Sequence, residues 1–383
     1  MNKDVDSTSS LQVAELLSRG VEKVIPRELA EKKLRSGEKL RVYFGVDPTG
    51  AKLHLGHSVP LRKLKAFVDA GHEVIFLVGS FTAMIGDPSG RDIMRIPLTR
   101  EEVESNLKTY KEQAGKILDL SKIEVRYNHE WLDTLGFKDI VDLASNFTAQ
   151  QMLQRDMFDK RIKEGIPIAL HEFLYPLMVG YDSVVLDVDC ELGGSDQEFN
   201  MLAGRTLQSA YKKRDKFILT TKLIEGTDGR KMSKTYNNAI YLEDEAGDMY
   251  GKVMSVNDDL TKTYLENFTD LDMNEVEEIL KLHPKEAKMR LAFEITKLYH
   301  GEEKAKEAQE NFAETFSKGG IPADIKIVKA DKDTPLVDIF LEQGLVASKT
   351  EFNRLNDEGA IKEIESGVYR VGKHRFLRIE WQD

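Results

Sequence analysis

Apolar positions in the first part of the chain follow helical spacing in some segments and form unbroken runs in others. A run of strand-forming residues over 41–46 is followed by a turn over 47–50 and a helical repeat over 57–70. A second apolar run, over 74–78, lacks alternation, which is typical of a strand covered on both faces. Strand, helix and strand within about forty residues predict a right-handed βαβ unit in a parallel sheet.

A helix is expected before this unit, over residues 11–25. Its apolar side chains fall roughly on one face: Leu11, Leu17, Val21, Val24 and Ile25. Residues 98–165 are predicted to be mostly helical and charged. Two further strands are expected over 184–188 and 217–220, with a helix over 197–209 between them.

The last third of the chain has a different pattern. Residues from 247 to about 318 show only helical spacing, and Gly319–Pro322 interrupts it. Residues 334–383 predict two short helical stretches, then strand alternation over 367–379 with a turn at Gly372 and Lys373. These shifts indicate a separate helical part and a small terminal part.

Composition narrows the class of protein. A chain of 383 residues suggests two or three domains, and 41% hydrophobic with 32% charged residues is typical of a globular protein. The single cysteine, Cys190, excludes a disulfide framework within one chain. The sequence has no signal-peptide pattern and no run of about 18 apolar residues, so a soluble cytosolic protein is expected. A net charge of −11 argues at first against a nucleic-acid partner.

The sharpest local pattern is Asp47-Pro-Thr-Gly-Ala-Lys-Leu-His-Leu-Gly-His57, between a predicted buried strand and a predicted helix. Helix N-termini offer free N–H groups and a positive dipole end, which favour phosphate. His54 and His57 are three residues apart and so share one helical face. An incomplete zinc site or a pair of surface histidines is the alternative, although no nearby Cys or third His completes a metal set.

A second pattern is Gly226-Thr-Asp-Gly-Arg-Lys-Met-Ser-Lys-Thr235. Its two lysines, hydroxyl groups and glycines suit a mobile loop that closes positive charge over a triphosphate. Taken alone, it is more typical of a solvated hairpin tip with ordinary surface lysines.

Further polar positions join these motifs. Asp87, in Ile85-Gly-Asp-Pro-Ser-Gly-Arg91, is expected close to a strand end, where open α/β sheets bind ligands, although a turn aspartate is the simpler interpretation. Tyr175-Pro-Leu-Met-Val-Gly-Tyr-Asp182 and Gly193-Gly-Ser-Asp-Gln197 suggest a half-polar pocket, although the tyrosines also suit a core. Neither a Walker loop nor a G-x-G-x-x-G motif occurs.

In this order, the motifs resemble those of class I aminoacyl-tRNA synthetases. His-Leu-Gly-His at 54–57 and Lys-Met-Ser-Lys-Thr at 231–235 are similar to the two class signatures, and the other motifs resemble the tyrosyl-tRNA synthetases of bacteria. The resemblance implies an α/β Rossmann-type parallel-sheet domain over 1–246, with an inserted helical and dimer region at about 98–165. It further implies a helical domain over 247–322 and an S4-like α+β RNA-binding domain over 333–383.

The resemblance also implies roles for individual residues. Tyrosine binding falls on Tyr43, Asp87, Tyr175, Val179, Asp182 and Gln197. Catalysis on ATP falls on Thr49, His54, His57, Lys231, Lys234 and Thr235. Contacts with ATP and the adenylate fall on Gly45, Asp47, Gly56, Gly194, Asp196, Met232 and Ser233, and RNA binding on Lys349, Arg354, Lys373 and Arg375. Arg91 and Arg95 occupy a loop that is basic in the family.

The resemblance implies that the substrates are tyrosine, ATP and the tyrosine tRNA. It also implies that the protein is a homodimer in the cytoplasm. Mg²⁺ is expected with ATP, without a dedicated protein site. One position departs from the family pattern: Val179 stands where a glutamine usually helps to hold the substrate ammonium. Valine can neither donate nor accept a hydrogen bond, so another group must compensate or tyrosine affinity is lower.

Three alternatives remain open at this point. A tryptophanyl enzyme shares the fold and both signatures, but Tyr43 and Asp182 suit a phenol better than an indole. An RNA-binding protein that has lost aminoacylation is the second alternative, and a small-molecule nucleotidyltransferase is the third. The net charge allows a tRNA partner if positive charge is local, as in Tyr211–Arg214 and in the terminal Arg370, Lys373, Arg375 and Arg378.

Overall fold

The computed structural model describes residues 10–50, 52–89, 98–317, 325–332, 334–372 and 375–382. The chain divides into two compact units, Met1–Asp244 with Val256–Ala287, and Glu245–Ser255 with Lys288–Asp383. Each unit is described by itself.

The first unit contains a six-stranded sheet in the order β1-β6-β5-β2-β3-β4. All neighbouring strands are parallel except the edge strand β1, which runs antiparallel to β6. The strands are β1 (Val21–Ile25), β2 (Arg41–Val46), β3 (Glu73–Val78), β4 (Glu124–Tyr127), β5 (Cys190–Gly194) and β6 (Phe217–Thr221). The predicted α/β fold with a parallel sheet is therefore confirmed, with one antiparallel edge.

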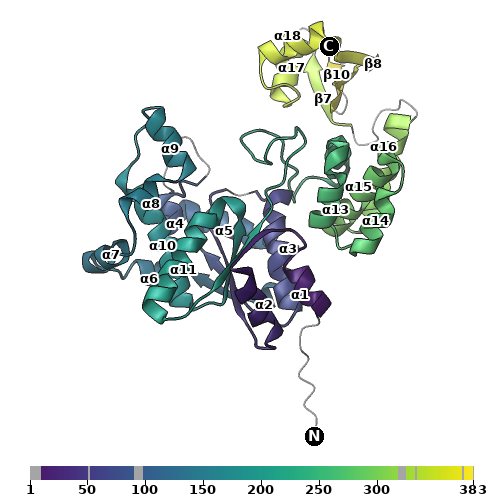
Figure 1. Cartoon of the computed structure of the whole chain (residues 1–383). Coiled ribbons are helices and arrows are strands. Elements are labelled where there is room, and N and C mark those ends of the chain that lie inside the picture. Colours follow the sequence, from purple (N-terminus) through teal and green to yellow (C-terminus); the bar gives the residue numbers. More distant parts are fainter. Residues whose placement is uncertain are drawn as a thin grey trace. The chain divides into compact units, whose positions relative to one another are not determined.

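Helices flank this sheet, and Figure 1 shows α1 and α3 on one side of it and α10 and α11 on the other. The helices that precede β5 in the chain begin with α1 (Ser10–Leu16), α2 (Arg27–Arg35), α3 (Leu55–Asp69), α4 (Thr82–Ile85), α5 (Arg100–Ala114), α6 (His129–Leu132), α7 (Phe137–Ala144), α8 (Ala149–Leu153) and α9 (Asp156–Lys163). They are followed by α10 (Leu170–Leu186), α11 (Glu198–Lys212), α13 (Thr261–Phe268) and α14 (Met273–Leu280).

The core lies where β2 and β3 are covered on both faces. Residues 42–44 and 74–78 are buried, as the unbroken apolar runs predict. Tyr43 packs in one cluster with Ile75, Leu77 and Leu186, so it faces α10. The predicted βαβ unit is confirmed as β2, α3 and parallel β3.

The sheet opens at the carboxyl ends of its two middle strands. β2 pairs with β5 only from Val42–Cys190 to Phe44–Leu192. Beyond that point β2 continues beside β3 as far as Val46, and β5 continues beside β6 as far as Gly194. The chain order reverses between β2 and β5, and such a crevice is where open α/β sheets bind ligands.

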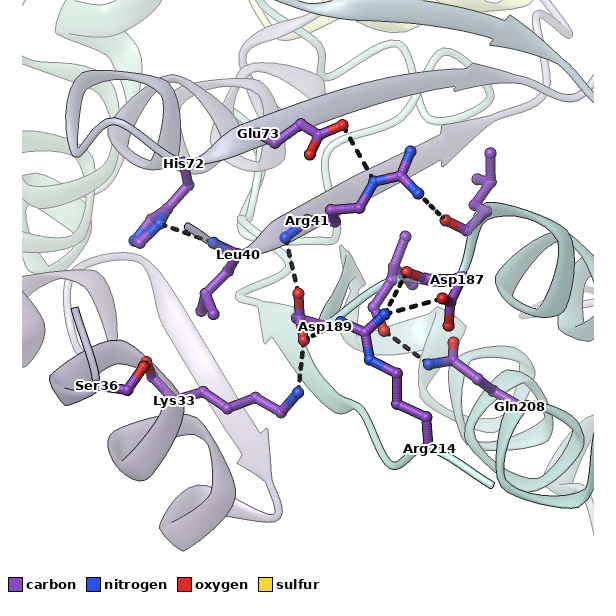
Figure 2. A network of polar contacts seen from close by, with 12 residues as sticks. Lys33, Ser36, Leu40, Arg41, His72, Glu73, Asp187, Asp189, Gln208 and Arg214 are labelled. Atoms are coloured by element: carbon purple, nitrogen blue, oxygen red, sulfur yellow. Dashed lines mark hydrogen bonds and ion pairs between the residues drawn. The ribbon is translucent and has the colours of Figure 1, made fainter. Parts of the chain in front are cut away.

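The amino ends of the same strands are held together by Asp189. Its carboxylate accepts hydrogen bonds from Lys33 Nζ and Arg214 Nη2, both at 2.5 Å, and from the Arg41 backbone N–H at 2.9 Å. Figure 2 shows these contacts, together with the pair between Arg41 and Glu73 at 3.1 Å. Arg214 is thus engaged by this network, although the sequence suggested it as part of a basic patch.

The predicted N-terminal helix over 11–25 is wrong beyond its first half. Helix α1 ends at Leu16, and Val21–Ile25 forms strand β1. Gly20 adopts φ 70°, which breaks the helix between the two. The β-branched Val21, Val24 and Ile25 suit a strand, and pairing with β6 decides the conformation.

The strand predicted over 184–188 is also wrong. Helix α10 continues to Leu186, and Asp187 ends it with φ 49°. The strand is instead Cys190–Gly194, whose glutamate and glycines weaken a strand pattern. Residues 98–165 are mostly helical as predicted, but they contribute β4 to the main sheet.

The second unit holds α12 (Ala246–Ser255), most of α15 (Pro284–His300) and α16 (Glu302–Ser317). It continues with β7 (Ile327–Asp331), α17 (Leu336–Glu342), α18 (Lys349–Asp357), β8 (Ile361–Glu365), β9 (Val368–Val371) and β10 (Arg375–Gln382). These four strands form a sheet in the order β7-β10-β9-β8 around a small core of their own. The sequence predicted both terminal helices and the β9–β10 alternation but missed β7 and β8. None of the helices in the described ranges is long and apolar enough to cross a membrane.

Candidate active site

Tyr43 and Asp182 are both buried. Tyr43, on β2, is 1% exposed, and Asp182, on α10, is 2% exposed. Trp131 Nε1 donates to Asp182 Oδ1 at 2.8 Å, and Asn128 Nδ2 donates to Oδ2 at 3.3 Å. Burial raises the pKa of Asp182 despite these two donors, and burial also raises the pKa of Tyr43.

A chain of hydrogen bonds runs from Asp182 to the end of β2. Asn128 Nδ2 also donates to Thr82 Oγ1 at 3.0 Å, and Thr82 Oγ1 donates to Asp47 Oδ1 at 2.7 Å. The Tyr175 hydroxyl donates to Asp47 Oδ2 at 2.9 Å. The structure thus brings Asp47 together with Tyr175 and Asp182 of α10, although Asp47 lies far from that helix in sequence.

A second chain surrounds Asp87. Gln197 Nε2 donates to Asp87 Oδ2 at 2.8 Å, and the Ser89 N–H donates to Asp87 Oδ1 at 2.9 Å. Asn200 Nδ2 donates to Gln197 Oε1 at 2.9 Å. Asp87 follows α4 and is separated from β3 by that short helix, so it does not directly follow a strand end as predicted.

Arg155 joins this second chain from the α8–α9 junction. Its Nη2 donates to Ser89 Oγ at 2.9 Å, and its guanidinium lies 4.5 Å from the ring centroid of Phe199. Desolvation lowers the pKa of Arg155 to about 10, against the opposing charge of Asp87. Val179 is half-buried on α10, one helical turn after Tyr175.

The two histidines lie at the start of α3. His57 Nδ1 accepts from the His54 N–H at 3.2 Å, and the two rings stack with centroids 3.8 Å apart. Desolvation lowers the pKa of His54 to about 2 and that of His57 to about 4, and the charge of Lys231 adds to both effects. Both imidazoles are therefore neutral N–H donors at neutral pH. A Cβ at Gly56 would lie 3.0 Å from His54 Nδ1, so a side chain there would crowd the histidine ring.

The second signature meets the first at this point. The buried Met232 accepts from the Gly56 N–H through Sδ at 3.4 Å, and Lys231 Nζ pairs with Asp196 Oδ2 at 2.9 Å. The Ser233 N–H donates to Asn238 Oδ1 at 2.8 Å. The structure therefore unites the segments 54–57, 194–197 and 231–233.

Other predicted residues lie at the margins of this cluster. Lys234 and Thr235 are exposed on the turn that follows Ser233. Thr49 is half-buried, and its N–H donates to the Asp47 carbonyl at 2.8 Å. Gly45 is exposed in the opened part of β2, and Gly194 is the last residue of β5.

The predicted RNA-binding residues are exposed around α18 but already have acidic neighbours. Lys349 pairs with Asp338 at 2.8 Å, Arg354 with Glu358 at 3.0 Å and Arg375 with Glu351 at 3.6 Å. Lys373, Arg91 and Arg95 lie outside the described residues.

Sequence reasoning missed the residues that support the pocket. They are Thr82, Ser89, Asn128, Trp131, Arg155, Ser183, Glu191, Asn200 and Lys216. Asn128 and Trp131 follow directly after β4, so a correct assignment of that strand would have indicated them. Among the residues described, no group of three or more His, Cys, Asp or Glu side chains could hold a metal ion.

Comparison with known proteins gives the family. The family model for tRNA synthetases class I (W and Y) matches residues 35–317. The tyrosine–tRNA ligases of Thermotoga maritima and Nitratidesulfovibrio vulgaris are each 46% identical to this chain over 95% of it, and over 96% and 97% of their own lengths. A C-terminally truncated mitochondrial tyrosyl-tRNA synthetase from Aspergillus nidulans shares the fold, with a TM-score of 0.68 at 24% identity over 80% of this chain and 94% of that one. The family predicted from the motifs is thereby confirmed: this chain belongs to the tyrosine–tRNA ligases, within the class I tRNA synthetases.

Proposed function

We propose that the chain activates tyrosine with ATP and transfers the tyrosyl group to the tyrosine tRNA. The observation that carries this proposal is the presence of two chemistries near the carboxyl ends of β2 and β5. The buried Tyr43 and Asp182 suit a phenolic hydroxyl, and His54, His57 and Lys231 suit phosphate.

The reaction proceeds in two displacements. The tyrosine carboxylate attacks the α-phosphorus of ATP, the bond to the bridging oxygen of the β-phosphate breaks, and pyrophosphate leaves. A ribose hydroxyl at the end of the tRNA then attacks the acyl carbon, and AMP leaves. The substrate supplies the nucleophile in each step, so the protein contributes positioning and charge stabilisation.

The tyrosine site combines both hydrogen-bond chains. Tyr43 and Asp182 bind the phenolic hydroxyl, and Asp87, Tyr175 and Gln197 bind the ammonium group. Asp87 suits this role because hydrogen bonds from Gln197 and Ser89 already hold its carboxylate in place. Val179 contributes apolar packing only, and the carboxylate oxygens of Asp87 take the place of the glutamine amide that is missing at position 179.

The ATP site lies at the start of α3. Neutral His54 and His57 donate to phosphate and ribose oxygens, aided by Thr49 and by the helix N-terminus. Lys231, Lys234 and Thr235 close over the leaving pyrophosphate. The adenylate contacts fall on Gly45, Asp47, Gly56, Gly194, Asp196, Met232 and Ser233. Mg²⁺ arrives with ATP as part of that substrate.

The tRNA contacts of the terminal part complete the proposal. The sheet β7-β10-β9-β8 with α17 and α18 is an S4-like RNA-binding domain, with Lys349, Arg354, Lys373 and Arg375 on phosphates. Surface ion pairs are worth only about 0–1 kcal/mol, so these side chains can exchange acidic neighbours for phosphate. The boundaries 1–246 and 247–322 and a cytoplasmic location belong to the same proposal, and β7 (Ile327–Asp331) moves the start of the terminal domain from the expected residue 333 to about residue 327.

Exposed apolar side chains of the 98–165 region support association into a homodimer. Phe137 is 84% exposed and Val141 54% exposed, on α7, and Ile162 is 53% exposed on α9. Apolar exposure of this kind is typical of a surface that another protein covers. Light scattering after size exclusion tests this point.

Amino-acid-dependent exchange of pyrophosphate into ATP, measured with each of the twenty amino acids, tests the proposed activity. Exchange with tyrosine alone is expected. Exchange with tryptophan alone would instead establish the sister specificity. A folded protein with no exchange but with tRNA binding would establish a binding protein and contradict the proposal.

A further inference from the structure

A buried ion pair lies behind the tyrosine site. Lys216 precedes β6 and is 0% exposed, and its Nζ pairs with Glu191 on β5, which is 3% exposed. Lys216 Nζ also donates to Ser183 Oγ on α10 at 2.5 Å, and Ser183 is itself 0% exposed. The Ser183 hydroxyl lies 3.1 Å from the hydroxyl of Tyr43.

The fold is shaped around this pair. A side chain at Gly204 on α11 would come within 2.6 Å of both Lys216 Nζ and Ser183 Oγ, and within 2.9 Å of Glu191 Oε2. Lys216 Nζ also lies 5.6 Å from the centroid of the Tyr43 ring. A buried ion pair often stabilises a fold no better than apolar residues of the same volume. Stability is therefore a weak reason for this pair, and its position beside Tyr43 points to the substrate site.

The pair restricts the directions of the hydrogen bonds. An ammonium group only donates, so Ser183 Oγ must accept from Lys216. The single proton of Ser183 then has two acceptors within reach, Glu191 Oε2 at 3.2 Å and the Tyr43 oxygen at 3.1 Å. Glu191 Oε2 already accepts from Lys216. Glu191 also interacts with the Tyr43 hydroxyl, so Ser183 and Glu191 together fix the position of that hydroxyl.

A hydroxyl held at this point complements a phenolic substrate. The substrate hydroxyl has one proton to give and lone pairs to fill, and Asp182 can accept the proton. Tyr43 is the second polar side chain for that hydroxyl, and its position depends on Ser183 and, through Ser183, on Lys216 and Glu191.

We propose that Lys216, Glu191 and Ser183 are positioning residues that hold the Tyr43 hydroxyl in place for the substrate phenol, and thereby set the preference for tyrosine over phenylalanine. This inference rests on the proposed tyrosine activation. Its chemistry concerns the placement of a hydrogen-bonding group, so it predicts an effect on substrate selection rather than on ATP.

The test is a double-mutant cycle of Ser183→Ala and Tyr43→Phe. For each variant, kcat/KM in pyrophosphate exchange is measured with tyrosine and with phenylalanine. Ser183→Ala alone is expected to lower kcat/KM for tyrosine about tenfold and to leave phenylalanine within about twofold, since one buried hydrogen bond is worth about 1.4 kcal/mol. In the Tyr43→Phe background, Ser183→Ala is expected to change the ratio no further.

Thr269→Val is the matched control, because it also removes a buried hydroxyl, one that donates to the Leu265 carbonyl at 2.6 Å. The tyrosine-to-phenylalanine ratio of this control should equal that of the unmodified chain. Lys216→Met combined with Glu191→Leu removes both charges together and should lower the ratio as Ser183→Ala does. If Ser183→Ala does not fold, Ser183→Cys takes its place in the cycle.

The inference would be overturned if Ser183→Ala lowered kcat/KM equally for tyrosine and phenylalanine. It would also be overturned if Ser183→Ala left the tyrosine-to-phenylalanine ratio unchanged when Tyr43 is present. A further fall in the ratio when Ser183→Ala is added to Tyr43→Phe would contradict it as well. Failure of the proposed function is distinguished by the unmodified chain, which would then show no exchange with tyrosine.

Discussion

Burial changes the chemistry of single side chains in this site. Asp182 is held by Trp131 and Asn128, and yet desolvation raises its pKa. The two histidines are shifted in the opposite sense, since loss of water disfavours their cationic forms. Selection of the substrate therefore depends on groups that have no bulk water to replace a lost partner.

Asp182→Ala should relax the choice of tyrosine over phenylalanine. The tyrosine hydroxyl loses a charged partner worth about 1.5–3 kcal/mol, so the ratio of kcat/KM values should fall by about 10- to 100-fold. Pyrophosphate exchange with both amino acids measures this. Asp259→Asn, at an exposed position, is the control. Unchanged selectivity in Asp182→Ala would show that Asp182 does not contact the substrate hydroxyl.

His54→Ala and Lys234→Ala should slow adenylate formation while tyrosine affinity changes little. Loss of one donor to the developing phosphoryl charge costs about 10²–10³ in rate. Rapid quench of a single turnover gives the rate, and equilibrium dialysis gives the affinity. An adenylate burst at the normal rate in either variant would contradict its role.

The histidine pair should also leave a signature in the pH profile. With pKa values of about 2 and about 4, His54 and His57 become protonated only in acid. Because kcat/KM reports the free enzyme, the value for ATP should show no histidine inflection between about pH 6 and pH 8. An inflection near pH 6.5 that disappears in His57→Gln would show that the pair is hydrated and charged.

Whole elements follow tertiary partners where local preference is ambiguous. Residues 184–186 contain two β-branched valines but remain in α10, because Gly180 allows α10 to pack closely on α11. Val21–Ile25 carries a helix-like spacing but pairs with β6. In both cases packing outweighs differences in propensity of about 1 kcal/mol or less per residue.

Asp189→Asn tests how much the contacts at the amino ends of β2 and β5 contribute to stability. The change leaves Lys33 and Arg214 without their shared carboxylate. Removing one partner of a buried pair costs about 3–5 kcal/mol, and the partial exposure of both cations reduces this to about 2–3 kcal/mol. Urea unfolding at neutral pH measures the loss, and exposed Asp259→Asn is again the control.

The same residue predicts a dependence of stability on pH. Hydrogen bonds and cations lower the pKa of Asp189 in spite of its burial. Its contribution is therefore present above the unfolded pKa of about 3.9 and is lost as the pH falls through the lower folded value. The stability difference between Asp189→Asn and the unmodified chain should narrow below about pH 4, and a constant difference down to pH 2 would contradict this account.

Charge acts at the scale of the whole molecule. The chain carries −11, and some of its cations are held in local pairs, as Arg214 and Lys216 show. A tRNA partner must therefore be bound through a few exposed cations. Weak, salt-sensitive binding confined to such patches is expected.

Replacing Lys349, Arg354 and Arg375 together by glutamine should weaken tRNA binding. For each phosphate that is no longer neutralised, the slope of log affinity against log salt should also fall by about one. Filter binding across a salt series measures both, and tyrosine-dependent exchange should be unaffected. Exposed Lys281→Gln is the control, and an unchanged slope in the triple variant would exclude these residues from the interface.

Much of the molecule was predictable from local chemistry in the chain. The βαβ unit over 41–78, the helical segment after 247 and the two signature motifs follow from periodicity, turn residues and spacing, which act over short stretches. The same motifs in order were sufficient to predict the family.

Only the tertiary structure decided how distant residues meet. Asp182 receives Trp131, Tyr43 has Lys216 behind it through Ser183, and Asp196 faces Lys231. Strand pairing and helix packing create these contacts, and nothing in the neighbouring sequence marks the buried Lys216 as part of a site. Periodicity reports what a residue does for its own element, whereas partners and desolvation depend on the elements that pack against it.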